Sequence, residues 1–348
     1  MSSEAIKIQL GEAFGRGKVI PDYLVQTPLY LWHKLAFTYN PAQITNLQKL
    51  LDTLQQKQDQ LEAIAASLDE SQISDLVSIA LKIEALSTGR YGESEVIITP
   101  GDSPFSMHLS NVAQCKFNAL SELQGKVAAA KKAANGECGT YILTEDDILQ
   151  TRATICGETR AETASSHKDK KYRKTKAFIA DPSVGEASNA ILLITPFETL
   201  VEGCVRDYLE WISGPVAAEL PKPIRAILND YLFLAIHPFP DGNTKQARVI
   251  YRASLSNFGI DPRNLVSSGQ TLTFPEMHTT YTSMKRWIMS EDGPELAYWV
   301  ENMLERLIVA FDRTVERAEK MRDLGVVGAW SAERKELASI EKKLGISM

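Results

Sequence analysis

The chain has 348 residues, of which 44% are hydrophobic, and its formal net charge at pH 7 is −6. This length and apolar content allow one large or two smaller domains with a buried core, and they exclude an intrinsically disordered chain. The acidic balance argues against a nucleic-acid partner, for which clustered basic residues would be expected.

The first part of the chain has the hydrophobic spacing of helices. Apolar residues recur every three or four positions over residues 47–68, and two further helices are expected at 73–86 and 117–134. A polar, glycine-containing stretch at 135–139 ends this pattern. We therefore predict an N-terminal helical region over residues 1–138.

A second region begins with a helix start signal at Thr144, where Asp147 takes the place of the usual capping-box glutamate. Two short segments with strand character, 172–179 and 190–194, then flank a glycine-containing turn at 181–189. Segments of this length on either side of such a turn predict a β-hairpin.

The rest of the chain predicts helices again. The apolar run over 226–236 indicates a helix, and the Lys- and Glu-rich residues 313–343 are expected to form one or two exposed helices interrupted near Gly325. No apolar run reaches the length of a membrane span, and the first residues lack the features of a secretory leader. We therefore expect an all-α fold with one small hairpin, no membrane partner and a cytoplasmic location.

The most informative stretch, residues 237–248, directly follows the helix expected at 226–236. It opens with His237, and an imidazole with an ordinary pKa of about 6.5 can accept a proton from an attacking hydroxyl. Asp241 follows four residues later, and a carboxylate is the ligand that Mg²⁺ prefers when the metal also holds substrate phosphates. The pair predicts a catalytic base and a metal ligand in one small site.

The second half of this stretch has the residues of a phosphate site. Gly242 and Asn243 readily take positive φ, so the backbone N–H groups from Thr244 onward can form an anion nest at the start of a new helix. Lys245 near that start and Arg248 one turn further can point toward a β- or γ-phosphate. The residues alone therefore predict a site for a nucleoside triphosphate.

These residues resemble the signature of the Fic (filamentation induced by cAMP) family, which runs His-x-Phe-x-Asp/Glu-Gly-Asn-Gly-Arg-x-x-Arg. The matching positions are His237, Phe239, Asp241, Gly242, Asn243 and Arg248. Thr244 and Lys245 replace the second glycine and the first arginine. The resemblance covers about residues 140–312, and it implies a Fic-type helical bundle at 139–312, with the hairpin as a flap over the active site and a helical tail at 313–348.

The resemblance implies transfer of AMP from ATP to a Ser, Thr or Tyr hydroxyl of a target protein. In that reaction His237 is the base, and Mg²⁺ held by Asp241 bridges the α- and β-phosphates. The turn from Gly242 to Lys245, together with Arg248, holds the triphosphate.

Two further features follow from the same resemblance. The flap docks an extended segment of the target, which we expect to contact Ile194 and Thr195. Many Fic proteins also carry an inhibitory helix with the pattern Ser/Thr-x-x-x-Glu-Gly/Asn, and only its glutamate is present here, as Glu84 in the helix expected at 73–86. Its carboxylate is expected to pair with Arg248 and to exclude the γ-phosphate.

The two departures from the signature leave alternatives open. Thr244 is strained if its position needs positive φ and is tolerated if it is helical, and Lys245 lacks the planar two-point grip of arginine. A Doc-like phosphotransferase that uses the γ-phosphate, a catalytically impaired nucleotide- or protein-binding module, and a different nucleotide donor all remain alternatives. An ordinary loop with Asn243 or Thr244 as a helix N-cap is another alternative, and a homo-oligomer is left open.

Overall fold

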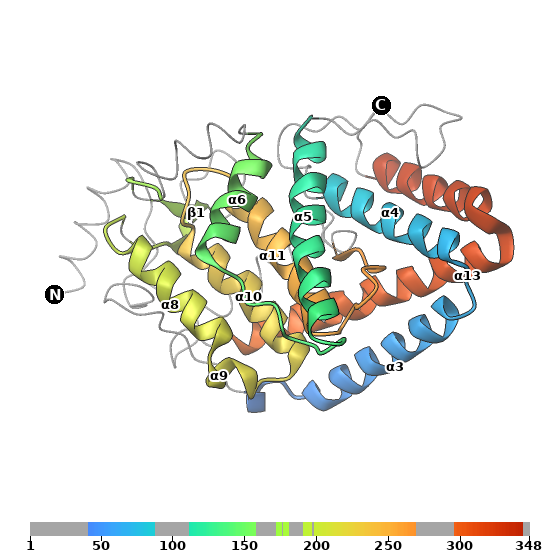
Figure 1. Cartoon of the computed structure of the whole chain (residues 1–348), viewed down its shortest axis with the longest axis horizontal. Helices are drawn as coiled ribbons and strands as arrows, with labels where there is room; N and C mark the ends of the chain where they lie inside the picture. Colours follow the sequence, from blue (N-terminus) through green and yellow to red (C-terminus); the bar gives the residue numbers. More distant parts are fainter. Residues whose placement is uncertain are drawn as a thin grey trace.

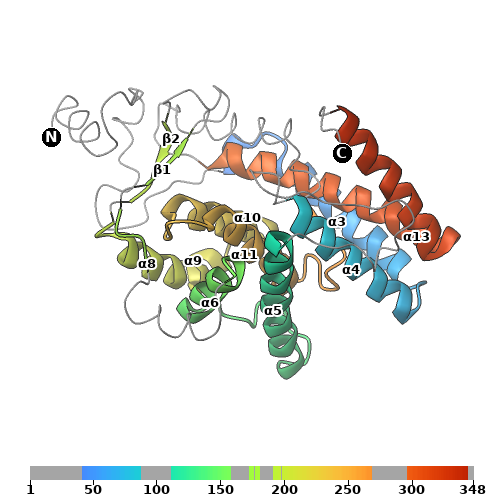
Figure 2. The same cartoon turned by 90° about the horizontal axis from the view of Figure 1, so that it is seen from above.

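The computed structural model of the chain describes residues 41–87, 111–157, 172–175, 177–180, 191–196, 198–268 and 296–343. These residues form a helical bundle with one β-hairpin, which confirms the predicted fold class. Two antiparallel helices lie at its centre, α10 (Lys222–Ile236) and α11 (Asn243–Asn257), and the signature loop joins them. Figures 1 and 2 place this pair between α8 on one side and α5 on the other.

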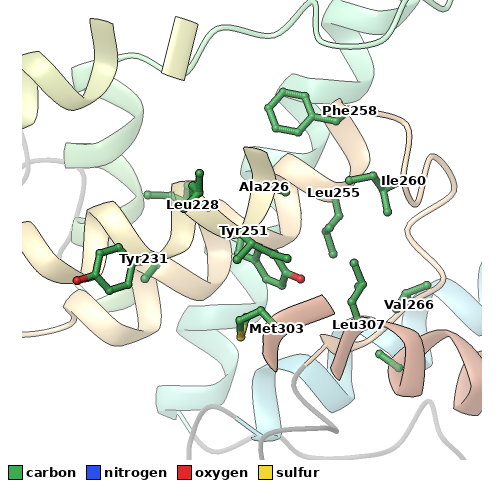
Figure 3. Packing of buried hydrophobic residues seen from close by; sticks show 14 of the residues in the cluster. Ala226, Leu228, Tyr231, Tyr251, Leu255, Phe258, Ile260, Val266, Met303 and Leu307 are labelled. Atoms are coloured by element: carbon green, nitrogen blue, oxygen red, sulfur yellow. The ribbon is translucent and has the colours of Figure 1, made fainter. Parts of the chain in front are cut away.

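Helix α10 is buried because its sequence leaves almost no polar face. From Ile224 to Ile236 nearly every side chain of α10 is inaccessible, as expected for a helix that is apolar all round. Tyr231 of α10, Tyr251 of α11 and Met303 of α13 belong to one hydrophobic cluster, part of which is drawn in Figure 3. Each fully buried large side chain stabilises the fold by about 1.5–3 kcal/mol, so this cluster fixes the two helix ends that bear the signature.

Two helices cover α11. They are α5 (Asn111–Ala133) and α6 (Glu145–Ile155), and both contact it. The predicted capping box at the start of α6 is confirmed: Thr144 Oγ1 accepts from the Asp147 N–H at 3.2 Å, and the Asp147 carboxylate accepts from the Thr144 N–H at 2.9 Å. On the other side of the pair, α8 (Val201–Ser213) contacts α10, and the short α9 (Pro215–Ala218) connects the two.

The remaining helices are α3 (Leu47–Ala65), preceded by the 3-10 turn η1 (Pro41–Gln43), α4 (Glu70–Ser87) and α13 (Ala297–Lys343). The predicted apolar face of α3 is observed, with Leu54 and Leu61 buried in the same core as α10. The helices on both sides of residue 138 therefore share one hydrophobic core. The division there into two regions stays a prediction, and residues 1–40 and 88–110 of the first region lie outside the described residues.

The prediction of an exposed C-terminal tail is wrong for its first part. Thr314, Val315, Ala318 and Met321 are buried, and this stretch of α13 lies in the same core as α3. Burial of one helix face requires only about one apolar residue per turn, and the many Lys and Glu residues between these positions made the apolar face difficult to recognise in the sequence. The expected interruption is present at Gly325, whose φ of 68° breaks the helical backbone.

The hairpin pairs β1 (Phe178–Ala180) with β2 (Ile191–Ile194) in antiparallel register, with Phe178 opposite Ile194. The strand predicted at 172–179 begins only at Phe178 in the structure. Arg173, before it, bonds to the backbone of the signature loop instead of to a neighbouring strand. The turn at 181–189 lies outside the described residues. No helix in the described ranges is both long and apolar enough to cross a membrane.

Candidate functional site

His237 stands where α10 ends. It is the C-cap residue, with left-handed φ and ψ of 50° and 58°, and its N–H donates to the Phe233 carbonyl at 3.1 Å. The next residue, Pro238, cannot continue a helix, so the chain turns here and the imidazole emerges at the helix end. Burial, with a smaller contribution from nearby Arg173, lowers the pKa of His237 to about 4. The ring is therefore neutral at physiological pH, the form in which it acts as a base.

The loop after His237 is closed by one side chain. Asn243 accepts from the Phe239 N–H at 2.9 Å and donates to the Phe239 carbonyl at 2.7 Å. Phe239 is itself 1% exposed, and its ring lies 5.7 Å from that of Tyr172. The side chain of Asn243 is thus engaged within the loop, and the backbone N–H is the group that it can offer to a ligand.

The turn into α11 favours glycine because of its backbone conformation. Gly242 has a φ of 85°, which side chains rarely adopt, whereas a Cβ built there would meet Cys156 Sγ and Ile155 Cγ2 only at the ordinary contact distances of 3.6 and 3.7 Å. Its N–H donates to Asp241 Oδ1 at 2.6 Å, while the Asp241 side chain is exposed. The first N–H groups of an α-helix have no partner within the helix. The turn therefore presents backbone donors beside an accessible carboxylate.

Thr244 lies inside the first turn of α11 and is exposed. Within the described residues only Asn135, His237 and Asn264 combine a side chain with positive φ. Thr244 therefore has an ordinary helical backbone, and replacing the glycine of the signature introduces no left-handed strain here. Of the two possibilities stated for this position, the structure has the tolerated one.

Two cations follow on α11. Lys245 and Arg248 are half-buried, and Arg248 Nη1 is inaccessible yet makes no hydrogen bond within the described part of the chain. Asp230 on α10 is 3% exposed, and burial raises its pKa to about 6 although nearby Arg248 opposes that shift. The sequence interpretation missed Asp230, although a carboxylate in the middle of an otherwise apolar helix was an available signal.

Glu84 lies on α4 and is 3% exposed. Its Oε2 accepts from the hydroxyls of Ser267 and Ser268 at 3.3 and 3.2 Å. Glu84 and Arg248 both act electrostatically on buried Asp230. The carboxylate thus lies beside the basic residues of α11, but no ion pair within 4 Å joins it to Arg248 among the described residues. The expected ion pair between Glu84 and Arg248 is therefore not formed, although the two residues lie near each other.

Arg173 is a further residue that the sequence interpretation missed. It is 2% exposed, its N–H donates to the Pro238 carbonyl at 2.9 Å, and its Nε donates to the His237 carbonyl at 2.7 Å. Its Nη1 donates to the Thr175 carbonyl at 2.8 Å, and its Nη2 donates to Thr195 Oγ1 at 3.0 Å. One guanidinium therefore fastens the base of the hairpin to the backbone of His237.

The two flap residues are placed differently from each other. Thr195 is 4% exposed, and its hydroxyl donates to the Ala177 carbonyl at 2.6 Å while accepting from Arg173. Ile194 is paired with Phe178 in the hairpin. The hydroxyl of Thr195 is engaged within the fold, and the role of both residues in docking a target stays a prediction.

A surface cleft lies away from this loop. It is lined by α3, by Lys222 at the start of α10 and by Phe258 just after α11. A helix of fifteen residues spans about 22 Å, so the cleft lies at the opposite end of the helix pair from His237. None of the signature side chains reaches it.

Known proteins resemble this chain in part of its sequence and in its fold. No family model matches the chain. The Protein adenylyltransferase Fic of Nematostella vectensis is 25% identical over 170 residues, which make up 49% of this chain and 34% of that protein. The chain therefore matches about a third of the length of this curated relative.

Solved structures resemble the chain over more of its length. A Fic family protein from Desulfovibrio desulfuricans superposes with a TM-score of 0.55 and 15% identity, covering 80% of this chain and 76% of that one. A Fic domain containing signaling protein from Bacteroides thetaiotaomicron gives a TM-score of 0.48 and 13% identity, covering 78% of this chain and 97% of that one. The first of these likenesses shows the fold.

Proposed function

Since this chain belongs to the Fic family, we propose that it transfers AMP from ATP to the hydroxyl of a Ser, Thr or Tyr side chain in a target protein. The observation that carries the proposal is the arrangement of the signature loop. A neutral imidazole, His237, stands at one end, and the N-terminus of α11 with Lys245 and Arg248 stands at the other. A base and an anion-binding helix end on one short loop are the two parts that such a transfer needs.

His237 acts on the target and not on the nucleotide. It accepts the proton of the target hydroxyl while the hydroxyl oxygen attacks the α-phosphorus. The new oxygen–phosphorus bond forms as the bond from the α-phosphorus to the bridging oxygen breaks, and pyrophosphate leaves. The burial that lowers the pKa of His237 keeps the imidazole unprotonated and available.

The start of α11 holds the triphosphate. Its free N–H groups at positions 243–245 point where a helix binds anions, and Lys245 and Arg248 add full positive charges within one turn. Charge placed in advance stabilises the developing negative charge of phosphoryl transfer without reorganisation. These groups therefore bind the nucleotide and orient it in line with His237.

Asp241 fits a magnesium ligand. It is exposed, and one of its oxygens is fixed by the Gly242 N–H. In the described part of the chain no three His, Cys, Asp or Glu side chains gather into a metal cage. A single carboxylate suits Mg²⁺, which completes its shell from substrate phosphates and water. When bound, the ion would neutralise phosphate charge.

The hairpin is the docking element for the target. Each strand is paired on one side within the described residues, so an extended target segment can add along a free edge by backbone hydrogen bonds. Ile194 ends the second strand and Thr195 follows it, and Arg173 ties that end to the backbone of His237. A segment bound at this edge is thereby brought close to the base.

Glu84 makes the enzyme auto-inhibited in this proposal. Its buried carboxylate lies among the same charges as Arg248, as their joint influence on Asp230 indicates. A fixed negative charge there reduces the positive potential available to a γ-phosphate. Nucleotide binding is then weakened until the carboxylate moves or is removed.

Phosphate transfer is the second candidate function. The observation that favours it is the replacement of the signature Gly-Arg by Thr244 and Lys245. Lysine is a compact point charge and lacks the planar fork with which arginine fixes two phosphate oxygens. A nucleotide held less rigidly at this end can bind in another pose, with its γ-phosphate next to His237.

ATP labelled on either the α- or the γ-phosphate separates these functions. The whole chain is incubated with Mg²⁺ and each label, alone and with candidate target proteins, and His237→Ala is the matched control. Label retained only from the α position, and lost in the variant, supports AMP transfer. Label retained only from the γ position replaces it with phosphate transfer. Tight ATP binding without either label leaves a binding module and overturns the proposal.

A further inference from the structure

Lys116 on α5 is buried without a hydrogen-bond partner. It is 2% exposed, and its Nζ is inaccessible and bonded to no group in the described residues. Other lysines of this helix behave differently: Lys126 pairs with Asp147 at 2.7 Å, and Lys132 is exposed. Burying an ammonium group without a partner is strongly unfavourable, so the position of Lys116 calls for an explanation outside the chain's own contacts.

Helix packing places Lys116 next to the phosphate site. Leu120 and Leu123 of α5 lie in one hydrophobic cluster with Val249 of α11. Gln124, further along α5, reaches Asn264 after the end of α11 with a bond of 2.8 Å, so the two helices run in the same general direction. One turn before this cluster, α5 carries Lys116 and α11 carries Lys245.

A chain of close contacts gives the same position. A Cβ built on Gly157, after α6, would lie 3.6 Å from Sγ of Cys115, the neighbour of Lys116. A Cβ on Gly242 would lie 3.6 Å from Sγ of Cys156. The beginning of α5 therefore touches the end of α6, which touches the turn that starts α11.

The electrostatics of this region leave positive charge in excess. Burial and the neighbouring charge of Lys245 lower the pKa of Lys116 to about 7, while Glu84 acts in the opposite direction. Arg248 adds a third cation with an unbonded Nη1, and the buried Asp230 lies near it as a second carboxylate beside Glu84, so three cations face two anions. A bound polyanion would offset this repulsion, and Glu84 supplies part of the compensating charge without it.

We propose that Lys116 binds the terminal phosphates of the nucleotide, so that Lys116, Lys245 and Arg248 together form a three-cation cradle at the start of α11. This inference rests on the proposed function, because the ligand is the nucleotide of the same site. It also predicts a ligand specificity, because affinity for the cradle depends on the number of phosphates in the nucleotide. Triphosphates should gain from Lys116, and nucleoside monophosphates should not.

The test compares Lys116→Met with Lys132→Met, an exposed lysine of the same helix, by titration calorimetry. ATP, AMP and inorganic tripolyphosphate are the ligands. Lys116→Met is expected to weaken ATP and tripolyphosphate about tenfold and to leave AMP within about twofold, whereas Lys132→Met changes none of them. Without ligand, Lys116→Met should unfold at the same or a higher temperature, since it removes an unpaired buried charge.

Equal affinities of wild type and Lys116→Met for ATP and tripolyphosphate would overturn the inference, as would an equal loss for AMP. If the methionine variant does not fold, Lys116→Gln provides the same comparison. A wild type that binds tripolyphosphate through Lys116 but transfers no label removes the proposed function and leaves this inference standing. A wild type that binds neither ATP nor tripolyphosphate removes both.

Discussion

The two ends of α11 differ in whether their buried charged side chains have an ion-pair partner within the chain. At the C-terminal end Arg252 is 0% exposed, and its Nη1 lies 2.7 Å from Oδ2 of Asp261. The Asp261 carboxylate also accepts the N–H groups of Leu265 and Val266 at 2.9 and 2.8 Å. The charge of Arg252 is thus offset by an ion pair within the chain, although its Nε and Nη2 are buried without a hydrogen bond in the described residues.

At the N-terminal end the same helix leaves its charges open. Arg248, one turn before Arg252, has a buried Nη1 without a hydrogen bond, and unlike Arg252 it has no ion-pair partner among the described residues. The Nζ of Lys116 is likewise without a hydrogen bond or an ion-pair partner there. The buried Asp230 Oδ1 is also unbonded there. We interpret the paired Arg252 as a residue that stabilises the fold, and the unpaired Arg248 and Lys116 as residues that bind a ligand. Variants at one end should therefore alter activity, and variants at the other should alter stability.

The largest effect is expected from His237→Ala. Removing a general base lowers a transfer rate by about 10²–10⁴-fold, while ATP affinity and the unfolding temperature stay near their wild-type values. Transfer rates from α-labelled ATP and calorimetric ATP titrations measure both quantities. A variant that transfers label at the wild-type rate would remove His237 from the mechanism.

Matched asparagine variants compare the two ends directly. Asp261→Asn leaves Arg252 buried and uncompensated, so the free energy of unfolding should fall by about 3–5 kcal/mol. Asp230→Asn should leave stability at pH 8 unchanged or higher. The raised pKa of Asp230 means that its stability contribution is lost as pH rises through about 6, so the ionised carboxylate is unfavourable at pH 8. Urea denaturation at pH 8 measures the free energy of unfolding of both variants. An equal decrease in the two would contradict the difference between the two ends of α11.

Arg173→Met tests how the hairpin positions the base. The rate should fall about tenfold to a hundredfold, with ATP affinity unchanged, because the His237 carbonyl loses its bond to Nε. The wild-type rate should stay level as pH falls from 8 to 5, since a base whose pKa is about 4 remains deprotonated. Removing the nearby guanidinium charge raises that pKa, so the variant's rate should begin to fall at a higher pH. Identical pH profiles would leave Arg173 a purely structural residue.

The smallest effect is expected from Glu84→Gln. Removing this negative charge should tighten ATP binding about fivefold and increase automodification, because the γ-phosphate no longer competes with a carboxylate. Glu122→Gln, an exposed residue on α5, is the control. ATP affinity that is unchanged or weaker in Glu84→Gln would exclude an inhibitory role.

The sequence predicted those features that depend on local pattern. The apolar spacing of α3 and α10 and the capping box at Thr144 correspond to observed elements because each is encoded within a few residues of itself. The signature loop was likewise found from its own residues. Its geometry explains why Gly242 is retained at positive φ while Thr244 is accepted in the helix.

Other features could not be predicted because they depend on contacts between distant segments. Arg173 stands in the run Lys-Lys-Tyr-Arg-Lys-Thr-Lys, where nothing local separates a buried guanidinium from solvated neighbours. Lys116 is one of several lysines on α5, and only the packing of α11 distinguishes it. The buried face of α13 around Val315 was missed for the same reason, since charged residues flank each buried one.

The central claim, that the open charges at the start of α11 are reserved for a triphosphate, is tested by the thermal unfolding of wild type and Arg248→Met with and without ATP. Without ligand, the variant should be at least as stable as wild type. ATP at about a hundred times its dissociation constant should stabilise wild type by about 2.7 kcal/mol and the variant far less. Equal stabilisation of both proteins, or none of wild type, would contradict the claim.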